Sequence, residues 1–536
     1  MEEHDAAVSA IAERLKHFYA RREPFRVYHG STNSTRAVHK DRDKIVDTSR
    51  LNHVLGIDKD KKTALVEPNV SMDQLVAATL AQGLVPLVVM EFPGITAGGG
   101  FSGSAGESSS CRHGPFDATV LSIEIVLPDG TVARASQQRG GENPDLFWGA
   151  ASAFGTLGIV TLLEVRLRDA RPFVELTHHP AASFAAALAT LQAQVADPRV
   201  DFVDGIAFSP TSFVVCAGRL ADASEEEDAT TTTTTTKKKK KKVRTYLGRR
   251  DPWFYLDVRR RAAGAREPVT DRVPLADYLF RWDRGGFWVA RYAYRYFATP
   301  FNGATRRLLD RFMHARVMYH ALHASGLADT YVIQDVGVPY AAAEAFYRWL
   351  HRELGIYPLW LCPLRLRRPD EGGGGGAAYG LHADFADAAA TPEFVLNFGV
   401  WGPVPGAKQH DHGVRLNRDI EAKLRELGGK KTLYAQAYYT EDEFWQAYNR
   451  PAYDAVRAKY RADHLPSVYD KVKVDEGARA RAREGSRMPA ALRDVRPFQG
   501  LYGVYKAWRG GDYLLGKEKK REKAVVSGTE ASTTHS

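Results

Sequence analysis

Short apolar runs separated by polar turns fill the first 170 residues. Apolar residues recur at helical spacing across residues 5–20, which predicts an amphipathic helix there. A second helix is expected over residues 72–82, with Ser71 as its N-cap and Gly83 at its end. The other runs are too short for helices and predict strands at residues 25–28, 45–47, 63–68, 84–90, 118–127, 131–135 and 159–167.

The same mixture of elements continues beyond residue 171. We expect strands at residues 331–338, 357–361 and 393–401 and a helix at 341–354. Strands and helices do not alternate as regular βαβ units, so the pattern predicts an α+β fold class. The length of 536 residues exceeds one small core. We place a first domain at residues 1–170, a second at 171–475 and a basic extension at 476–536.

Three segments have compositions that cannot build a core. Residues 225–242 join acidic residues to a threonine run and a run of lysines, and residues 371–378 are rich in glycine. The tail from Lys517 is charged and then small and polar. Such segments bury too little apolar surface to fold, so we expect the threonine–lysine segment and the tail to be disordered. The glycine stretch is expected to be a flexible linker. The lysine run fits either an anionic membrane surface or an expanded surface loop.

The net charge of +10 is concentrated in two places. The lysine run supplies six positive charges, and residues 476–536 hold 13 Lys/Arg against 7 Asp/Glu. The rest of the chain is close to neutral, so nucleic-acid binding is not expected. The three cysteines, Cys111, Cys216 and Cys362, form no CxxC pair, which indicates a reducing, intracellular compartment and no metal site. No signal peptide is expected because the chain starts with acidic residues, and no membrane-spanning helix because no apolar run reaches 18 residues.

A glycine- and serine-rich loop is the strongest chemical signal. Residues 94–106 hold six glycines in thirteen positions, which lets the backbone adopt positive φ and approach a ligand closely. Exposed N–H groups and serine hydroxyls suit a pyrophosphate. The loop lacks the GK[ST] of a P-loop, and with no long helix after it a Rossmann site is disfavoured. Similar turns at residues 30–34 and 155–158 extend the signal, since three such turns can enclose one long ligand with two phosphates.

Six segments, taken in order, resemble the PCMH-type FAD-binding domain of the vanillyl-alcohol oxidase/p-cresol methylhydroxylase superfamily. They are residues 29–34, 66–75, 93–110, 125–130, 143–148 and 155–163. Within that superfamily the chain is similar to the Delta(24)-sterol reductase group. The segments that carry this second resemblance are residues 106–110, 332–336, 356–363, 433–435, 443–445 and 466–472.

The resemblance implies a two-part FAD-binding domain followed by an α+β cap domain over the flavin ring. It implies reduction of the C24–C25 double bond of a sterol side chain, with NADPH as electron donor. The expected location of the protein is cytoplasmic or peripheral to the endoplasmic reticulum membrane. Its membrane contact and its oligomeric state stay open. The cofactor-binding residues that it implies are Gly30, Ser31, Thr32, Asn33, Ser34, Thr96, Ala97, Gly98, Gly99, Gly100, Phe101, Ser102, Gly103, Ser104, Ala105, Gly106, Glu107, Ser108, Gly158 and Ile159.

Asn33 bears on how FAD is held. Many oxidases of the superfamily carry a covalently flavinylated histidine in this first turn, and the corresponding position here is Asn33. The resemblance therefore implies non-covalent FAD. His29 and His113 flank the two loops, and each is either a substitute attachment point or an ordinary hydrogen-bonded loop histidine.

Reduction of an isolated alkene needs a hydride at one carbon and a proton at the other, so the protein must supply an acid. The matching cap segments offer Tyr434, Tyr438, Asp335 and Glu443. We single out Tyr434 and Asp335 as catalytic candidates, although tyrosines in such runs are also common in cores. A cluster of aromatic residues at 280–296 either walls a sterol pocket, contacts a membrane or belongs to the cap-domain core.

Two other functions stay open at this point. An oxidase or dehydrogenase of the same superfamily would act on an alcohol, lactone or phenol, and Asn33 argues against the covalent oxidases. A non-catalytic FAD- or sterol-binding protein would keep the fold without turnover, because fold does not fix function.

Overall fold

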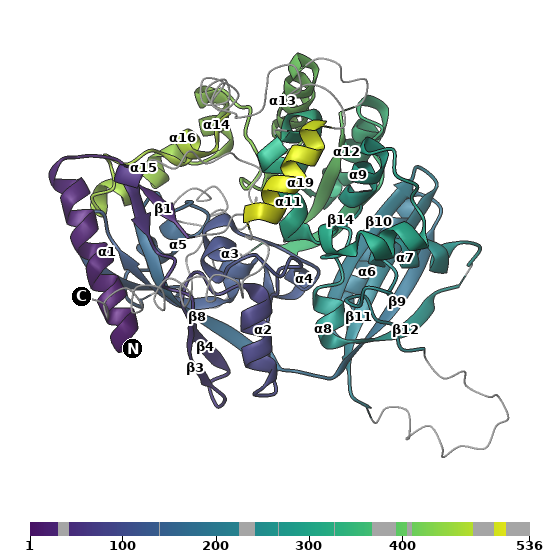
Figure 1. The fold of residues 1–536 in the computed structure, drawn as a ribbon, viewed down its shortest axis with the longest axis horizontal. Coiled ribbons are helices and arrows are strands. Elements are labelled where there is room, and N and C mark those ends of the chain that lie inside the picture. The colour runs from purple at the N-terminus through teal and green to yellow at the C-terminus, as the bar shows by residue number, and fades with distance from the viewer. Residues whose placement is uncertain are drawn as a thin grey trace, which may run out of the picture.

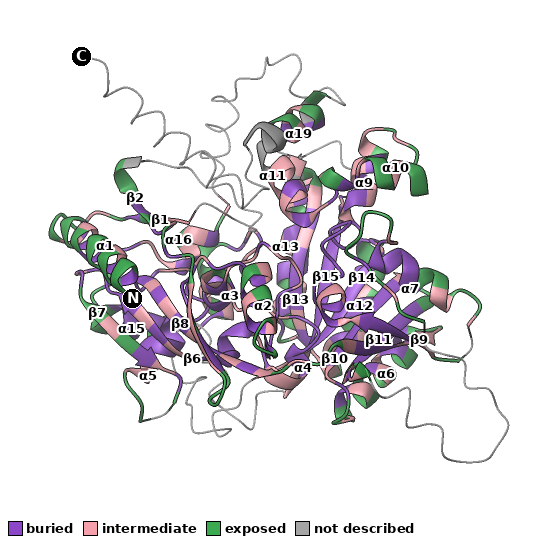
Figure 2. Cartoon of the chain, turned by 60° about the horizontal axis from the view of Figure 1, so that its bottom comes forward, coloured by how far each residue is buried: buried purple, intermediate pink, exposed green. Residues whose placement is uncertain are grey.

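The computed structural model describes residues 1–29, 42–138, 140–223, 242–265, 267–325, 327–366, 393–404, 410–474 and 498–510. Within these ranges the chain builds two antiparallel sheets, with helices on their outer faces (Figure 1). The strands are largely buried beneath more exposed helices (Figure 2). The expected α+β fold class is confirmed.

The first sheet has the strand order β3-β4-β8-β6-β7, and β5 also pairs with β8. The bounds are β3 Val54–Asp58, β4 Thr63–Val66, β5 Leu84–Pro86, β6 Val120–Val126, β7 Val132–Ser136 and β8 Ile159–Asp169. Strand β8 alternates buried and half-buried residues along its length, as a central strand does. A separate parallel pair is formed by β1 Arg26–Tyr28 and β2 Ile45–Asp47.

The second sheet has eight strands in the order β12-β9-β11-β10-β14-β15-β13-β16. The bounds are β9 Phe173–Ala181, β10 Phe202–Ser209, β11 Ser212–Ala221, β12 Val269–Pro274, β13 Tyr331–Pro339, β14 Leu359–Arg365, β15 Phe394–Pro403 and β16 Lys430–Lys431. Alternation along β13 divides its side chains between two faces. On one face, Val332, Val336 and Val338 belong to a core that helices cover. On the other face, Ile333 and Asp335 point towards the first sheet.

Helices cover both sheets. Those of the first 170 residues are α1 Glu2–Ala20, α2 Met72–Leu80, α3 Ala97–Gly103, α4 Ser110–His113 and α5 Pro144–Ala150. The helices that follow are α6 Phe184–Ala196, α7 Phe254–Ala262, α8 Leu275–Leu279, α9 Val289–Tyr296, α10 Gly303–Leu308, α11 Ala315–Ser325, α12 Tyr340–Glu353, α13 His410–Glu426, α14 Glu441–Ala447, α15 Arg450–Lys459, α16 Val468–Val472 and α19 Phe498–Gly510. Helices α6, α12 and α13 pack on the face of the second sheet that points away from the first.

The segment with α14, α15 and α16 packs against residues beside the first sheet. Lys459 Nζ lies 2.5 Å from Asp145 Oδ2 at the start of α5, and Tyr453 Oη donates to Thr156 Oγ1 at 2.8 Å. Residues far apart in sequence therefore close around the first sheet. The sequence-based domain boundaries at residues 170 and 475 stay a prediction.

Two expectations about local structure are wrong. The predicted strand over residues 84–90 pairs with its neighbour only from Leu84 to Pro86, although Val88, Val89 and Met90 stay buried. The glycine-rich loop contains the short helix α3, and the short helix α4 follows it. The glycines between residues 94 and 106 all keep negative or extended φ. Tertiary packing therefore overrides the low helix propensity of glycine here.

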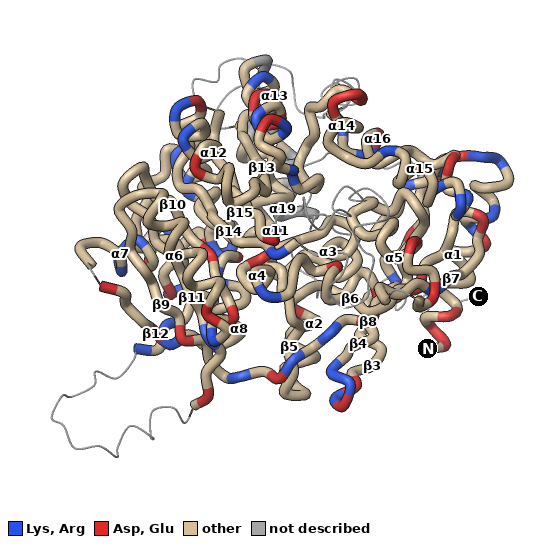
Figure 3. Tube along the Cα trace, turned by 180° about the vertical axis from the view of Figure 1, so that it is seen from behind, with Lys and Arg blue, Asp and Glu red and all other residues tan. Residues whose placement is uncertain are grey.

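Acidic and basic residues are interspersed along the described elements when the molecule is seen from behind (Figure 3). Most of the two basic stretches singled out in the sequence lies outside the described residues. Among the described residues, no helix is long and apolar enough to cross a membrane. The predicted disordered loops also lie outside the described ranges, apart from their edges.

Candidate functional site

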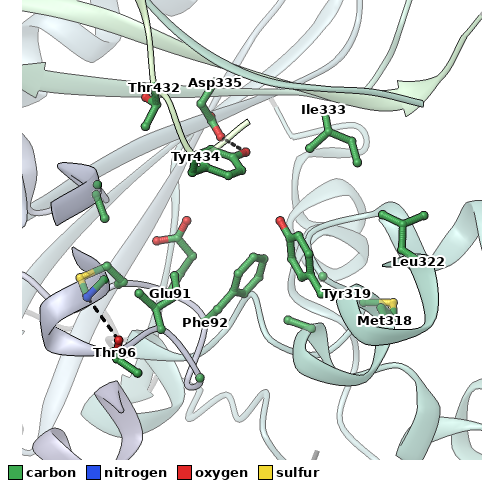
Figure 4. Close-up of a pocket in the computed structure, with 18 of the residues that line it drawn as sticks. Glu91, Phe92, Thr96, Met318, Tyr319, Leu322, Ile333, Asp335, Thr432 and Tyr434 are labelled. Atoms are coloured by element: carbon green, nitrogen blue, oxygen red, sulfur yellow. Dashed lines mark hydrogen bonds between the residues drawn. The ribbon is translucent and has the colours of Figure 1, made fainter. Parts of the chain in front are cut away.

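A large cavity lies between the two sheets. It measures about 560 Å³, which is within the range of small-molecule and cofactor sites. One wall comes from the glycine-rich segment and the turn before β8, and the other from α9, α11 and the second sheet. Figure 4 shows side chains from both walls pointing into the same space.

Helix α3 presents bare backbone to this cavity. Gly98, Gly99, Ser102 and Gly103 line it, whereas the intervening Ala97, Gly100 and Phe101 are buried away from it. The two sets are separated by helical spacing, so one face of α3 is core and the other is cavity wall. A Cβ on Gly98 would lie 2.6 Å from Pro68 Cβ, whereas a Cβ on Gly103 would meet no atom closer than 3.8 Å.

The turn before β8 supplies a second stretch of bare backbone. Gly155 has φ +68°, a region that glycine adopts without steric cost, and Gly158 has φ +152° with its Cβ position 2.5 Å from the Val126 oxygen. Both glycines line the cavity, as does Ile159. Lys471 Nζ donates to the Phe154 oxygen at 2.8 Å and brings a positive charge to this turn.

A buried polar network fixes the end of the glycine-rich segment. The Glu107 carboxylate accepts hydrogen bonds from Ser108 Oγ at 2.7 Å and from the Ser109 N–H at 2.8 Å. Arg281 Nη2 reaches both Ser108 Oγ at 3.3 Å and Asp204 Oδ2 at 2.8 Å. Asp204 belongs to β10, so the network ties the glycine-rich segment to the second sheet.

Asp335 and Tyr434, the two catalytic candidates, meet at the cavity wall. Tyr434 Oη donates to Asp335 Oδ2 at 2.6 Å, and Asn397 Nδ2 donates to Asp335 Oδ1 at 2.8 Å. Trp401 Nε1 lies 3.3 Å from Tyr434 Oη as a donor. Burial raises the pKa of Asp335 to about 6, although these hydrogen bonds favour the carboxylate. Burial and the Asp335 charge raise the pKa of Tyr434 well above its usual value.

A second carboxyl, Glu91, reaches the same cavity and was missed in the sequence. Its side chain points towards Tyr434 from the opposite wall (Figure 4). Burial, with the like charges of Glu107 and Asp335, raises the pKa of Glu91 to about 8. The available signal was an acidic residue placed directly between the apolar run ending at Met90 and the glycine-rich segment.

Beyond these acids the cavity is apolar. Its lining there comes from α9, α11, α19, the second sheet and the segments before α3, α9 and α11. It includes Phe92, Phe287, Phe312, Met318, Leu322, Ile333, Trp360 and Trp401. The aromatic residues at 280–296 contribute both to the core and to the cavity wall. Trp282 and Trp288 are core residues, whereas Phe287 and Tyr296 line the cavity.

The remaining residues singled out in the sequence differ in their position relative to the cavity. Residues 30–34, including Asn33, lie outside the described ranges, and His29 lines the cavity. His113 is not among the cavity-lining residues, and burial lowers its pKa to about 4. Tyr438 is not among them either, and Glu443 caps α14 and pairs with Arg418 at 3.1 Å. In the described part of the chain, no group of three or more His, Cys, Asp or Glu could hold a metal ion.

The described residues fit FAD. Gly98, Gly99, Gly103, Gly155 and Gly158 bring bare backbone to the cavity wall, and a Cβ on Gly103 would still find room there. The same cavity also has an apolar part. Such a surface suits a pyrophosphate joined to a flat ring system. When bound, FAD would supply hydride transfer, which no amino-acid side chain provides.

Comparison with known proteins agrees with this reading of the site. Residues 6–136 match the family described as FAD binding domain. Delta(24)-sterol reductase from Arabidopsis thaliana is 30% identical over 517 residues, covering 90% of this chain and 87% of that protein. The pea (Pisum sativum) protein of the same name is 28% identical over 523 residues, covering 90% of this chain and 87% of that protein. The Homo sapiens protein of that name is 27% identical over 432 residues, covering 78% and 76% of the two chains. The chain belongs to the Delta(24)-sterol reductase family.

Proposed function

We propose that this chain is an FAD-dependent reductase of the C24–C25 double bond of sterol side chains, with NADPH as the electron donor. The observation that carries the proposal is one cavity whose lining joins a glycine wall, an apolar part and the two carboxyls of Glu91 and Asp335. A rigid, apolar sterol matches the apolar part of the lining, and the family membership supports the reaction. The residues named as cofactor-binding, including residues 30–34, stay part of this proposal.

The division of labour follows from the chemistry of alkene reduction. Reduced FAD would supply the hydride, and the protein must place the alkene, exclude water and hold a proton beside it. The aromatic residues Phe92, Phe287 and Trp401 line the cavity and would exclude water once cofactor and sterol are bound. The Tyr434–Asp335 pair lies in this wall, and we assign both residues to the step in which the proton is delivered.

We propose that FAD is held without a covalent bond. Asn33 stands where covalent members of the superfamily carry histidine, and amide nitrogens do not form that link. The test is acid precipitation of the purified protein followed by a spectrum of the supernatant. Yellow flavin in the supernatant is expected. Flavin that stays in the pellet would contradict non-covalent binding, and His29, which lines the cavity, would then be the first attachment point to examine.

A peripheral contact with a sterol-bearing membrane is part of the proposal. Helix α19 flanks the cavity through Gly500 and Val504, and its residues Phe498, Leu501 and Tyr505 are 44–50% exposed at the spacing of one helical face. Flotation with sterol-containing vesicles tests the contact. The protein is expected to float, and serine at these three exposed positions is expected to reduce the floating fraction.

The activity itself is tested anaerobically in two steps. NADPH is added first, and bleaching of the flavin absorbance is expected. A sterol with a C24–C25 double bond is added next, and the absorbance is expected to return. Bleaching by an alcohol but not by NADPH would favour an oxidase or dehydrogenase of the superfamily. Bound flavin that responds to neither would favour a non-catalytic binding protein.

A further inference from the structure

Two carboxyls line the cavity in the described part of the chain, Glu91 and Asp335, and of these Asp335 is held by hydrogen bonds from other side chains. Glu91 lies in the segment between β5 and α3, so it enters from the same wall as the glycine face. In Figure 4 its carboxyl points across the cavity towards Tyr434, with the Tyr319 hydroxyl also directed into this space. Among the described residues, the hydrogen bond at the Glu91 carboxyl comes from its own backbone N–H and not from another side chain.

The charges around Glu91 favour its neutral form. The carboxyls of Glu107, on its own side, and of Asp335, across the cavity, oppose ionisation of Glu91. Arg281 favours ionisation, but it is paired with Asp204 at 2.8 Å. The neighbouring tyrosine Tyr319 is neutral, because burial and the Asp335 charge raise its pKa. Burial and these like charges raise the pKa of Glu91 to about 8, so it carries a proton at neutral pH.

The Tyr434–Asp335 pair differs from Glu91 in its protonation. The pKa of Asp335 is about 6, so at neutral pH this carboxyl is mostly ionised and accepts from Tyr434 and Asn397. The Tyr434 proton is therefore engaged with Asp335, and Tyr434 is a very weak acid in this position. The pair orients groups in the wall and contributes negative charge, whereas the transferable proton lies on Glu91.

We propose that Glu91 is the acid that delivers the proton to the alkene, with Tyr434 and Asp335 as positioning residues; this assignment rests on the proposed function. One alkene carbon takes a hydride, whose electron pair comes from the reductant. The alkene π electrons form the second C–H bond with the Glu91 proton, and the Glu91 O–H bond breaks. The electron pair of that bond stays on the carboxylate, which regains a proton from water.

The decisive variant is Glu91→Gln, which keeps the size of the protonated acid and removes its acidity. The flavin is first reduced chemically, so that donor binding plays no part, and the sterol is then added in a single turnover. We expect the sterol-dependent return of flavin absorbance to slow by roughly 100- to 10,000-fold. Glu443→Gln is the matched control. Its position keeps a capping box with Thr440 and lies away from the cavity, so the wild-type rate is expected.

The pH profile separates the role of Glu91 from a structural one. In the wild type the single-turnover rate is expected to fall as pH rises through about 8, and Glu91→Gln should lose this limb. Asp335→Asn removes a negative charge from the cavity, so the limb should move to lower pH. Tyr434→Phe should keep the limb while changing the rate. A Glu91→Gln protein with the wild-type rate, or with the same alkaline limb, overturns the assignment.

An infrared titration decides the protonation of Glu91 without any turnover. The full-length protein is expected to show a protonated carboxyl band that disappears with a midpoint near pH 8 and is absent in Glu91→Gln. Glu91 ionised at neutral pH overturns the inference. A wild type that shows this band yet never reacts with the sterol would instead refute the proposed function. Flavin content and melting temperature of each variant confirm that it is folded and loaded.

Discussion

Replacing Arg281 by Met is expected to destabilise the fold by about 3–5 kcal/mol, because it breaks a buried ion pair by removing one partner. Arg281 Nη2 lies 2.8 Å from Asp204 Oδ2, and the two side chains are 2% and 0% exposed. Methionine fills much of the volume, but among the described residues it leaves the Asp204 carboxylate with Trp360 Nε1, at 3.3 Å, as its remaining side-chain donor. Arg281 also donates to Ser108, so the glycine-rich segment should loosen and bind FAD more weakly.

Thermal and urea unfolding of four proteins measures the effect: wild type, Arg281→Met, Asp204→Leu and the double variant. Removing both charges is expected to recover most of the loss, because no buried charge is then left unpaired. Arg348→Met is the matched control, since its pair with Glu344 is exposed and worth about 0–1 kcal/mol. A single variant as stable as the control, or a double variant no more stable than Arg281→Met, would refute the reasoning.

Three further predictions concern the cavity and its surroundings. Gly103→Leu places a side chain in the cavity and should weaken FAD binding more than tenfold, about 1.4 kcal/mol. A fluorescence titration of the apoprotein measures the affinity. Gly303→Leu on the exposed helix α10 is the control and should leave the affinity unchanged. Equal affinities would remove α3 from the cofactor site. Burial alone would lower the pKa of His314, but its bonds to Asp283 and Asp310 raise it to about 9. The stability that these bonds provide is full below the unfolded pKa of about 6.5 and is lost as pH rises through 9, so the melting temperature should fall more steeply from pH 7 to 10 in the wild type than in His314→Gln. Tyr434→Phe should slow sterol reduction and leave flavin reduction by NADPH intact, and unchanged turnover would remove Tyr434 from the mechanism.

Local sequence patterns predicted the regular elements well. Helix α2 begins after a capping box of Ser71 and Gln74, and Gly83 has φ +76° just beyond its end, as the residue types imply. Helix α12 and strands β13 and β15 lie within two residues of their predicted bounds. These features depend on neighbours close in sequence, which is why apolar spacing and turn residues were sufficient.

The features that were missed depend on distant contacts. Three consecutive glycines argue against a helix, yet α3 forms because Ala97 and Phe101 are buried in the core of the first unit. Asp335 and Tyr434 were each named from the resemblance, but their contact across 99 residues follows from the way Thr432 pairs with the backbone of Asp335. Nothing in the sequence brings Glu91 to them, because that juxtaposition requires the two sheets to face each other.

The most direct test of the central claim is the identity of the product. The protein is loaded with FAD and incubated anaerobically with NADPH and a sterol that has a C24–C25 double bond, and the sterols are analysed by mass spectrometry. We predict a product that has gained two hydrogens at the side chain, and its amount should fall sharply with Glu91→Gln. Flavin that is reduced by NADPH while the sterol is recovered unchanged would contradict the claim that this cavity reduces the alkene.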